Sequence, residues 1–181
     1  MNGFVANFIG FDGRLNRQRF WMSALALLVV NIIVSLLILP IIGLSIMPDM
    51  SIMMDSTKTA EEISSYLVAA QSRAGWASLI LFVIFAYPLA AISIKRRHDR
   101  NNSGLDVWAY LGLTVIVLLV QALGFGSAMT DIGGMTVPMP SPLMSILSII
   151  VGILGIYLLV VLGFLKGTPG PNGYGPDPLQ G

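Results

Sequence analysis

The sequence has few charged residues and no cysteine. Only 10% of its 181 residues are charged, against 55% that are hydrophobic, and the mean hydropathy is +0.82. An ordinary soluble domain has about a quarter charged residues, so this chain cannot cover a water-exposed surface and is typical of an integral membrane protein. The absence of cysteine excludes disulfides, thiolate nucleophiles and cysteine-ligated metals.

A single histidine limits the chemistry further. His98 and Asp99 form a His-Asp pair, but metal phosphohydrolases with such a pair need several histidines, and the chain has one. His98 could act as a general base, yet Ser103 is the only nearby nucleophile and nothing around it signals activation. No phosphate loop or spaced set of metal ligands is present. We therefore expect no catalytic residue, metal or cofactor.

Four apolar segments are long enough to cross a membrane, whose hydrocarbon core of about 30 Å needs about 20 helical residues. They are residues 21–46, 76–94, 107–125 and 143–165. Pro40 and Gly43 are expected to bend or end the first segment, and Pro88 to kink the second. The segments show no period-two alternation of apolar and polar residues, which excludes a transmembrane β-barrel. The sequence predicts an all-α, single membrane domain (1–181), an integral membrane bundle of four transmembrane helices with a tail at 166–181.

The basic residues divide unevenly between the two sides of this arrangement. Eight of the ten basic residues lie before the first span, between the second and third spans, or after the fourth span. They are Arg14, Arg17, Arg19, Lys95, Arg96, Arg97, Arg100 and Lys166. The other side has only Lys58 and Arg73. Cytoplasmic loops carry the excess of lysine and arginine, so both termini are expected in the cytoplasm. The opening residues lack the basic region of a cleavable signal peptide, and the first span should remain as an anchor.

The two outer loops carry less information. Thr59 and Glu62 form a capping box, and Ile63, Leu67 and Ala70 recur at helical spacing. We expect a short amphipathic helix at the outer interface, with a solvated loop as the alternative. The second outer loop, residues 126–142, is rich in Gly, Pro and Met and contains no recognisable chemistry.

No Asp, Glu, Lys, Arg or His lies within the four spans, although ion-coupled transporters usually need such a residue at membrane depth. Asn31, Ser35 and Gln121 are the only hints of a polar path, which keeps a transporter or channel subunit as the alternative function. Small residues form helix-contact seams, either within the chain or toward a homo-oligomer or membrane partner. The seams are Ala86 and Ala90 in the second span, and Ser148, Gly152 and Gly155 in the fourth.

Three motifs on the predicted cytoplasmic side resemble the bacterial membrane-protein family catalogued as domain of unknown function 805. The first comprises Gly13, Arg14, Arg17, Phe20 and Trp21. The second comprises Arg96, His98, Asp99, Ser103 and Gly104. The third comprises Asn172, Tyr174, Gly175 and Pro178. The resemblance implies a location in the bacterial inner membrane and brings no established activity.

The basic loop around His98 has three interpretations. It could only fix the orientation of the chain and contact anionic lipid headgroups, at about 1 kcal/mol per basic residue. Alternatively, arginines from the first and second motifs could converge on an anion, with Asp99 orienting His98. The candidate ligand-binding residues are Arg14, Arg17, Arg96, Arg97, His98, Asp99, Arg100, Ser103, Gly104, Asn172 and Tyr174. A third reading is an enzyme on lipid-linked substrates. We expect membrane lipids as partners and no nucleic acid.

The tail is too rich in Gly and Pro to fold alone. It emerges on the same side as the basic loop, whose arginines supply hydrogen-bond donors in excess. We therefore expect the tail to fold over the loop as a lid, with Asn172 and Tyr174 at the contact and Tyr174 against the arginine stems. A disordered tail is the alternative.

Overall fold

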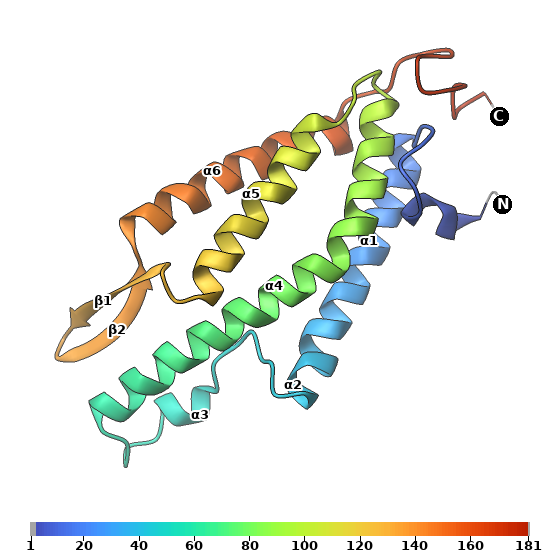
Figure 1. Cartoon of the computed structure of the whole chain (residues 1–181). Helices are drawn as coiled ribbons and strands as arrows, with labels where there is room; N and C mark the ends of the chain where they lie inside the picture. Colours follow the sequence, from blue (N-terminus) through green and yellow to red (C-terminus); the bar gives the residue numbers. More distant parts are fainter. Residues whose placement is uncertain (1–2, 181) are drawn as a thin grey trace. The chain divides into compact units, whose positions relative to one another are not determined.

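The computed structural model describes residues 3–180, apart from the side chain of Met135; Gly181, the last residue of the predicted tail, lies outside it. The chain is mainly helical, as Figure 1 shows, which confirms the predicted all-α membrane class. Within the described residues, four helices are long and apolar enough to cross a membrane: Arg17–Ile41, Ala60–His98, Leu105–Ala122 and Pro142–Phe164.

The elements follow one another with short connections. In chain order they are the 3-10 helix η1 (Phe4–Phe8), α1 (Arg17–Ile33), the π-helical turn η2 (Val34–Ile38), α2 (Leu39–Ile41), α3 (Met50–Met53), α4 (Ala60–His98), α5 (Leu105–Ala122), β1 (Ser127–Ile132), β2 (Met135–Pro140), α6 (Pro142–Leu159) and the π-helical turn η3 (Val160–Phe164). The first membrane helix ends at Ile41, just before Gly43, which has a φ of +77°. A left-handed glycine is a common helix terminator, and it makes this helix five residues shorter than expected at that end.

Helix α4 begins sixteen residues before the predicted second span. The capping box is present, because Glu62 N donates to Thr59 Oγ1 (3.2 Å) and Thr59 N donates to Glu62 Oε2 (2.8 Å). The helix then continues through Pro88 to His98, so the segment expected as a short amphipathic helix is the first part of α4. Its 39 residues would extend about 58 Å at 1.5 Å per residue, which exceeds the hydrocarbon core.

The chain forms two compact units. Residues 1–32, 83–113 and 151–181 make up the first, and residues 33–82 and 114–150 the second. All eight basic residues that the sequence places on one side belong to the first unit, whereas Lys58 and Arg73 belong to the second. We call the first the basic unit and the second the hairpin unit.

The hairpin unit contains a β-hairpin that the sequence did not predict. Strands β1 and β2 pair antiparallel, from Ser127 opposite Pro140 to Ile132 opposite Met135. Gly133 and Gly134 form the turn with φ values of +64° and +86°, the backbone geometry of a two-residue type I′ hairpin. In the same unit, a Cβ on Gly75 would lie 2.7 Å from Ala122 Cα, so glycine permits a close approach of α4 to the end of α5.

The basic unit packs the N-terminal segment against the helix ends. Phe11 contacts the rings of Tyr87 and Trp108 edge-on, each with centroids 5.5 Å apart. The ammonium of Lys95 donates to three carbonyls around η1, those of Ala6 (2.8 Å), Asn7 (3.3 Å) and Ile9 (2.7 Å). Buried polar groups need such partners, so the cation fixes the N-terminal segment beside α4.

The predicted small-residue seams divide between the inside and the outside. Ala90 of α4 is buried, and a Cβ on Gly155 of α6 would lie 3.6 Å from the ring of Tyr110 in α5. A Cβ on Gly152 would meet no atom within 4 Å. Gly155 therefore serves a contact within the chain, while Gly152 lies on an open helix face.

Candidate functional site

The end of the fourth membrane helix is held by side chains from two other helices. The last four carbonyls of an α-helix have no partner within the helix. Here the Leu162 carbonyl accepts from Arg96 Nε (2.8 Å) and the Leu165 carbonyl from Arg96 Nη2. The Gly163 carbonyl accepts from Trp21 Nε1 (2.9 Å) and the Phe164 carbonyl from Arg17 Nη1 (3.2 Å). Two cations at a helix C-terminus also complement its dipole.

Asp99 is the centre of a buried ion-pair network. Its carboxylate pairs with Arg14, where Nη2 lies 3.0 Å from Oδ1, and with Arg96 on its other oxygen. All three side chains are at most 5% exposed. The backbone carbonyl of Asp99 also accepts from Thr168 N at 2.8 Å. A Cβ on Gly167 would overlap the Asp99 carboxylate, so glycine is required where the tail crosses the network.

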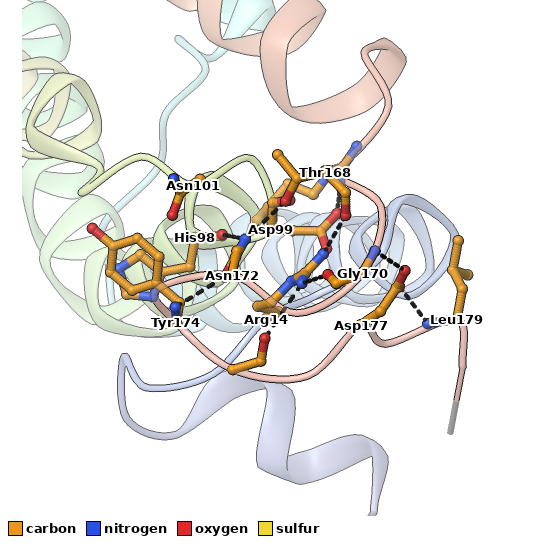
Figure 2. Close-up of polar contacts among 12 residues, drawn as sticks. Arg14, His98, Asp99, Asn101, Thr168, Gly170, Asn172, Tyr174, Asp177 and Leu179 are labelled. Carbon is orange, nitrogen blue, oxygen red and sulfur yellow. Dashed lines mark hydrogen bonds and ion pairs between the residues drawn. The ribbon is translucent and has the colours of Figure 1, made fainter.

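Arg14 joins this network to the C-terminal tail. Its guanidinium donates to the carbonyls of Thr168 (2.7 Å), Gly170 (2.6 Å) and Gly175 (3.4 Å), while Nε donates to Asp99 Oδ1 (3.1 Å). Figure 2 shows Arg14 between Asp99 and the curved tail. The planar fork of arginine suits this set of acceptors in several directions.

The tail lies on the α4–α5 loop, as Figure 2 shows around His98. Asn172 Nδ2 donates to the carbonyl of His98 (3.0 Å), and the ring of Tyr174 stacks on the imidazole with centroids 3.9 Å apart and an interplanar angle of 8°. Gly173 N donates to Asn101 Oδ1 at 3.3 Å. These contacts confirm the predicted lid with Asn172 and Tyr174 at its contact, although Tyr174 packs on His98 and not on the arginine stems.

A second carboxylate closes the tail on itself. Asp177 Oδ1 accepts from Leu179 N (3.0 Å) and Oδ2 from Gly170 N (2.9 Å). These two hydrogen bonds, Leu179's first, and the charge of Arg14 hold the pKa of Asp177 below its usual 3.8. The tail is thus a turn whose two ends meet at one ionised side chain.

The remaining predicted residues lie apart from this network. Arg97 pairs with Asp106 through Nη2 and Oδ2 at 2.9 Å. His98 Nδ1 contacts the Gly13 carbonyl at 3.2 Å, while the Asp99 carboxylate faces the two arginines. Arg100 is half-buried and Ser103 is exposed, and neither side chain takes part in a described hydrogen bond or ion pair. Gly104 has a φ of +79° just before α5.

A cavity of about 560 Å³ adjoins the network. Its lining comes from the first turn of α1, the end of α4 and the tail: Asn16, Arg17, Gln18, Arg96, Asp99, Lys166, Gly167, Thr168, Pro169, Asp177 and Leu179. Arg17, Arg96 and Asp99 were among the predicted site residues. Lys166 and Thr168 were not, because a lysine directly after a span is explained by orientation alone and Thr168 belongs to no motif.

One comparison with known proteins is positive. A family model described as "Protein of unknown function (DUF805)" matches residues 8–176. This match covers nearly the whole chain and confirms the resemblance that the three motifs indicated. No curated protein and no solved structure gives a significant match.

Proposed function

Because the chain belongs to this family, whose description assigns no activity, we propose from its own residues that it is a non-enzymatic protein of the bacterial inner membrane. It binds an anionic ligand in the cavity beside Arg17 and Lys166. The observation that carries this proposal is how the basic residues are paired. Some are buried with carboxylate or carbonyl partners, and we call these the satisfied cations; others are exposed beside the cavity, and we call these the available cations.

The satisfied cations hold the structure together. Arg14 and Arg96 share Asp99, Arg97 pairs with Asp106, and Lys95 is surrounded by backbone carbonyls. Burying such groups would be costly without these partners. Removing any of them would therefore disrupt the fold before it affected a ligand.

The available cations border the cavity. Arg17 is exposed and makes one described hydrogen bond, to the Phe164 carbonyl, and Lys166 is exposed with no ion pair among the described residues. Arginine offers a planar fork to an oxyanion and lysine a mobile point charge. At about 560 Å³, the cavity falls within the usual range for small-ligand sites, roughly 300–1,000 Å³.

The distribution of charge supports a cytoplasmic location for this cavity. Eight of ten basic residues belong to the basic unit, and cytoplasmic segments near membrane spans are the ones enriched in lysine and arginine. The cytoplasmic leaflet is also rich in anionic lipids. A lipid headgroup beside the first turn of α1 is therefore the first ligand to test.

The test compares two double variants with the same loss of charge. Arg17→Gln/Lys166→Gln removes the cavity cations, whereas Arg19→Gln/Arg100→Gln removes two cations that do not line the cavity. Purified full-length proteins in neutral detergent are titrated with short-chain phosphatidylglycerol, and with phosphatidylcholine of the same chain length. We expect the anionic lipid to raise the thermal midpoint of the parent and of the Arg19/Arg100 variant, but not of the Arg17/Lys166 variant.

The proposal would be contradicted if the two double variants lost the phosphatidylglycerol-dependent rise in thermal midpoint to the same extent. Such a result would show that the anion responds to the total surface charge and that the cavity has no special role. A parent protein that responds to phosphatidylcholine as strongly as to phosphatidylglycerol would also overturn it.

A further inference from the structure

The charges around the cavity do not balance, and this imbalance defines the ligand more closely. Within the network, two guanidinium groups share the single carboxylate of Asp99, which leaves one positive charge in excess. The carbonyls of Leu162, Leu165, Thr168 and Gly170 solvate these arginines but do not neutralise them.

The rim of the cavity adds a second positive charge. Arg17 and Lys166 contribute two cations there, and Asp177 is the one carboxylate that the described residues place on the rim. The depressed pKa of Asp177 keeps it ionised at neutral pH. The cavity and the network beside it therefore carry a net excess of two positive charges, and the side chains of the network are buried.

We infer that the ligand of this cavity is a phosphate monoester, and this inference rests on the proposed function. A monoester carries about −1.5 to −2 charges at pH 7 and neutralises the excess, whereas the phosphate diester of an ordinary membrane lipid carries one negative charge and leaves half of it uncompensated. Three terminal oxygens can also accept from the Arg17 fork and the Lys166 ammonium together.

The cavity has apolar parts that accommodate the remainder of such a ligand. Pro169 and Leu179 belong to its lining, and Leu179 is 78% exposed. The same phosphate chemistry can come from a lipid with a monoester headgroup or from a soluble phosphate. The two sources differ in whether acyl chains add to the affinity.

The experiment measures calorimetric dissociation constants for the full-length protein in neutral detergent. The ligands are short-chain phosphatidate (a monoester), phosphatidylglycerol of equal chain length (a diester) and glycerol 3-phosphate (a soluble monoester). We expect phosphatidate to bind at least about tenfold more tightly than phosphatidylglycerol. Arg17→Gln and Lys166→Gln should each reduce that ratio to about one, while Arg19→Gln should preserve it.

The outcomes separate this inference from the proposed function. If the parent protein bound the two lipids with equal affinity, the inference of a phosphate monoester would be wrong. The proposal of an anion-binding cavity would not be affected. Failure of all three ligands to bind would overturn both. Binding of glycerol 3-phosphate as tight as that of phosphatidate supports a soluble monoester as the ligand, and much weaker binding supports a lipid.

Discussion

At the scale of single residues, Gly163 is needed because the ring of Trp21 passes close to it. A Cβ on Gly163 would lie 2.5 Å from Trp21 Cζ2, whereas one on Gly152 would meet nothing within 4 Å. We predict that Gly163→Ala lowers the free energy of unfolding by about 1–3 kcal/mol, the usual cost of overpacking, because Trp21 must leave the end of the fourth membrane helix. Gly152→Ala is the matched control and should be neutral or stabilising.

Thermal unfolding of the two variants in detergent, followed by circular dichroism, measures the difference. A Gly163→Ala protein as stable as the Gly152→Ala protein would show that Trp21 does not hold the helix end. Such a result would remove the structural reason for a glycine at this position.

Arg14 is the residue whose replacement should release the tail. It donates hydrogen bonds to Asp99 and to carbonyls of Thr168 and Gly170, and its side chain is 1% exposed. Arg14→Lys keeps the charge but loses the fork, and one lost hydrogen bond of a charged group costs about 1.5–3 kcal/mol. We expect amide hydrogen exchange across residues 168–180 to accelerate about tenfold or more.

Arg19→Lys is the control for this exchange measurement. Arg19 is exposed and its side chain takes part in no described hydrogen bond, so its replacement should leave the tail protected. If Arg14→Lys and the parent exchange at the same rate, the tail is held by the contacts of Asn172 and Tyr174 and not by the arginine.

At the scale of elements, the closed turn of the tail should respond to acid. The pKa of Asp177 is lowered in the fold, so its hydrogen bonds to Leu179 N and Gly170 N contribute fully above its usual pKa of 3.8. Their contribution is lost as the pH falls through the lower pKa of the folded chain. We predict a cooperative change in the Gly170 and Leu179 amide resonances below about pH 3.8, measured by NMR in micelles.

Asp177→Asn separates this transition from general acid unfolding. The amide side chain does not take up a proton in this pH range, so the variant should show no step in these two resonances. A step that persists in the variant would assign the transition to another group, and the turn would not depend on Asp177.

Elements also show what could be predicted from the sequence and what could not. The capping box at Thr59 and the membrane helices depend on residues close together in the chain, and hydrophobic length reports them directly. The hairpin was missed because Pro138 and Pro140 argue against a strand, although both fit an edge strand. The Gly133–Gly134 pair was the signal that could have identified it.

The candidate site was less predictable because its contacts join distant parts of the chain. Asp99 bonds to Arg14, 85 positions away, and to its near neighbour Arg96. The sequence identified both arginines and Asp99 as site residues but did not show that they satisfy one another. Gly167 gave no signal, because only the fold reveals that the Asp99 carboxylate lies where a Cβ would be.

At the scale of the whole molecule, the basic unit contains the N-terminal segment, the α4–α5 loop and the tail. These three segments therefore share one side of the membrane if the four long helices cross it. Their lysine and arginine content predicts the cytoplasm. The proposed ligand site would then be accessible to cytoplasmic phosphates and to the inner leaflet, and not to the outside.

Because the chain has no cysteine, its orientation can be tested with single substitutions at exposed serines. Ser103→Cys lies in the basic unit and Ser56→Cys in the hairpin unit, and neither serine side chain makes a described polar contact. In spheroplasts, a membrane-impermeant maleimide should label Ser56→Cys and not Ser103→Cys, and detergent should make both reactive. Labelling of Ser103→Cys in intact spheroplasts would show that the orientation is the opposite of the predicted one. It would also place the cavity outside the cell, beyond the cytoplasmic phosphate monoesters that its charge excess fits.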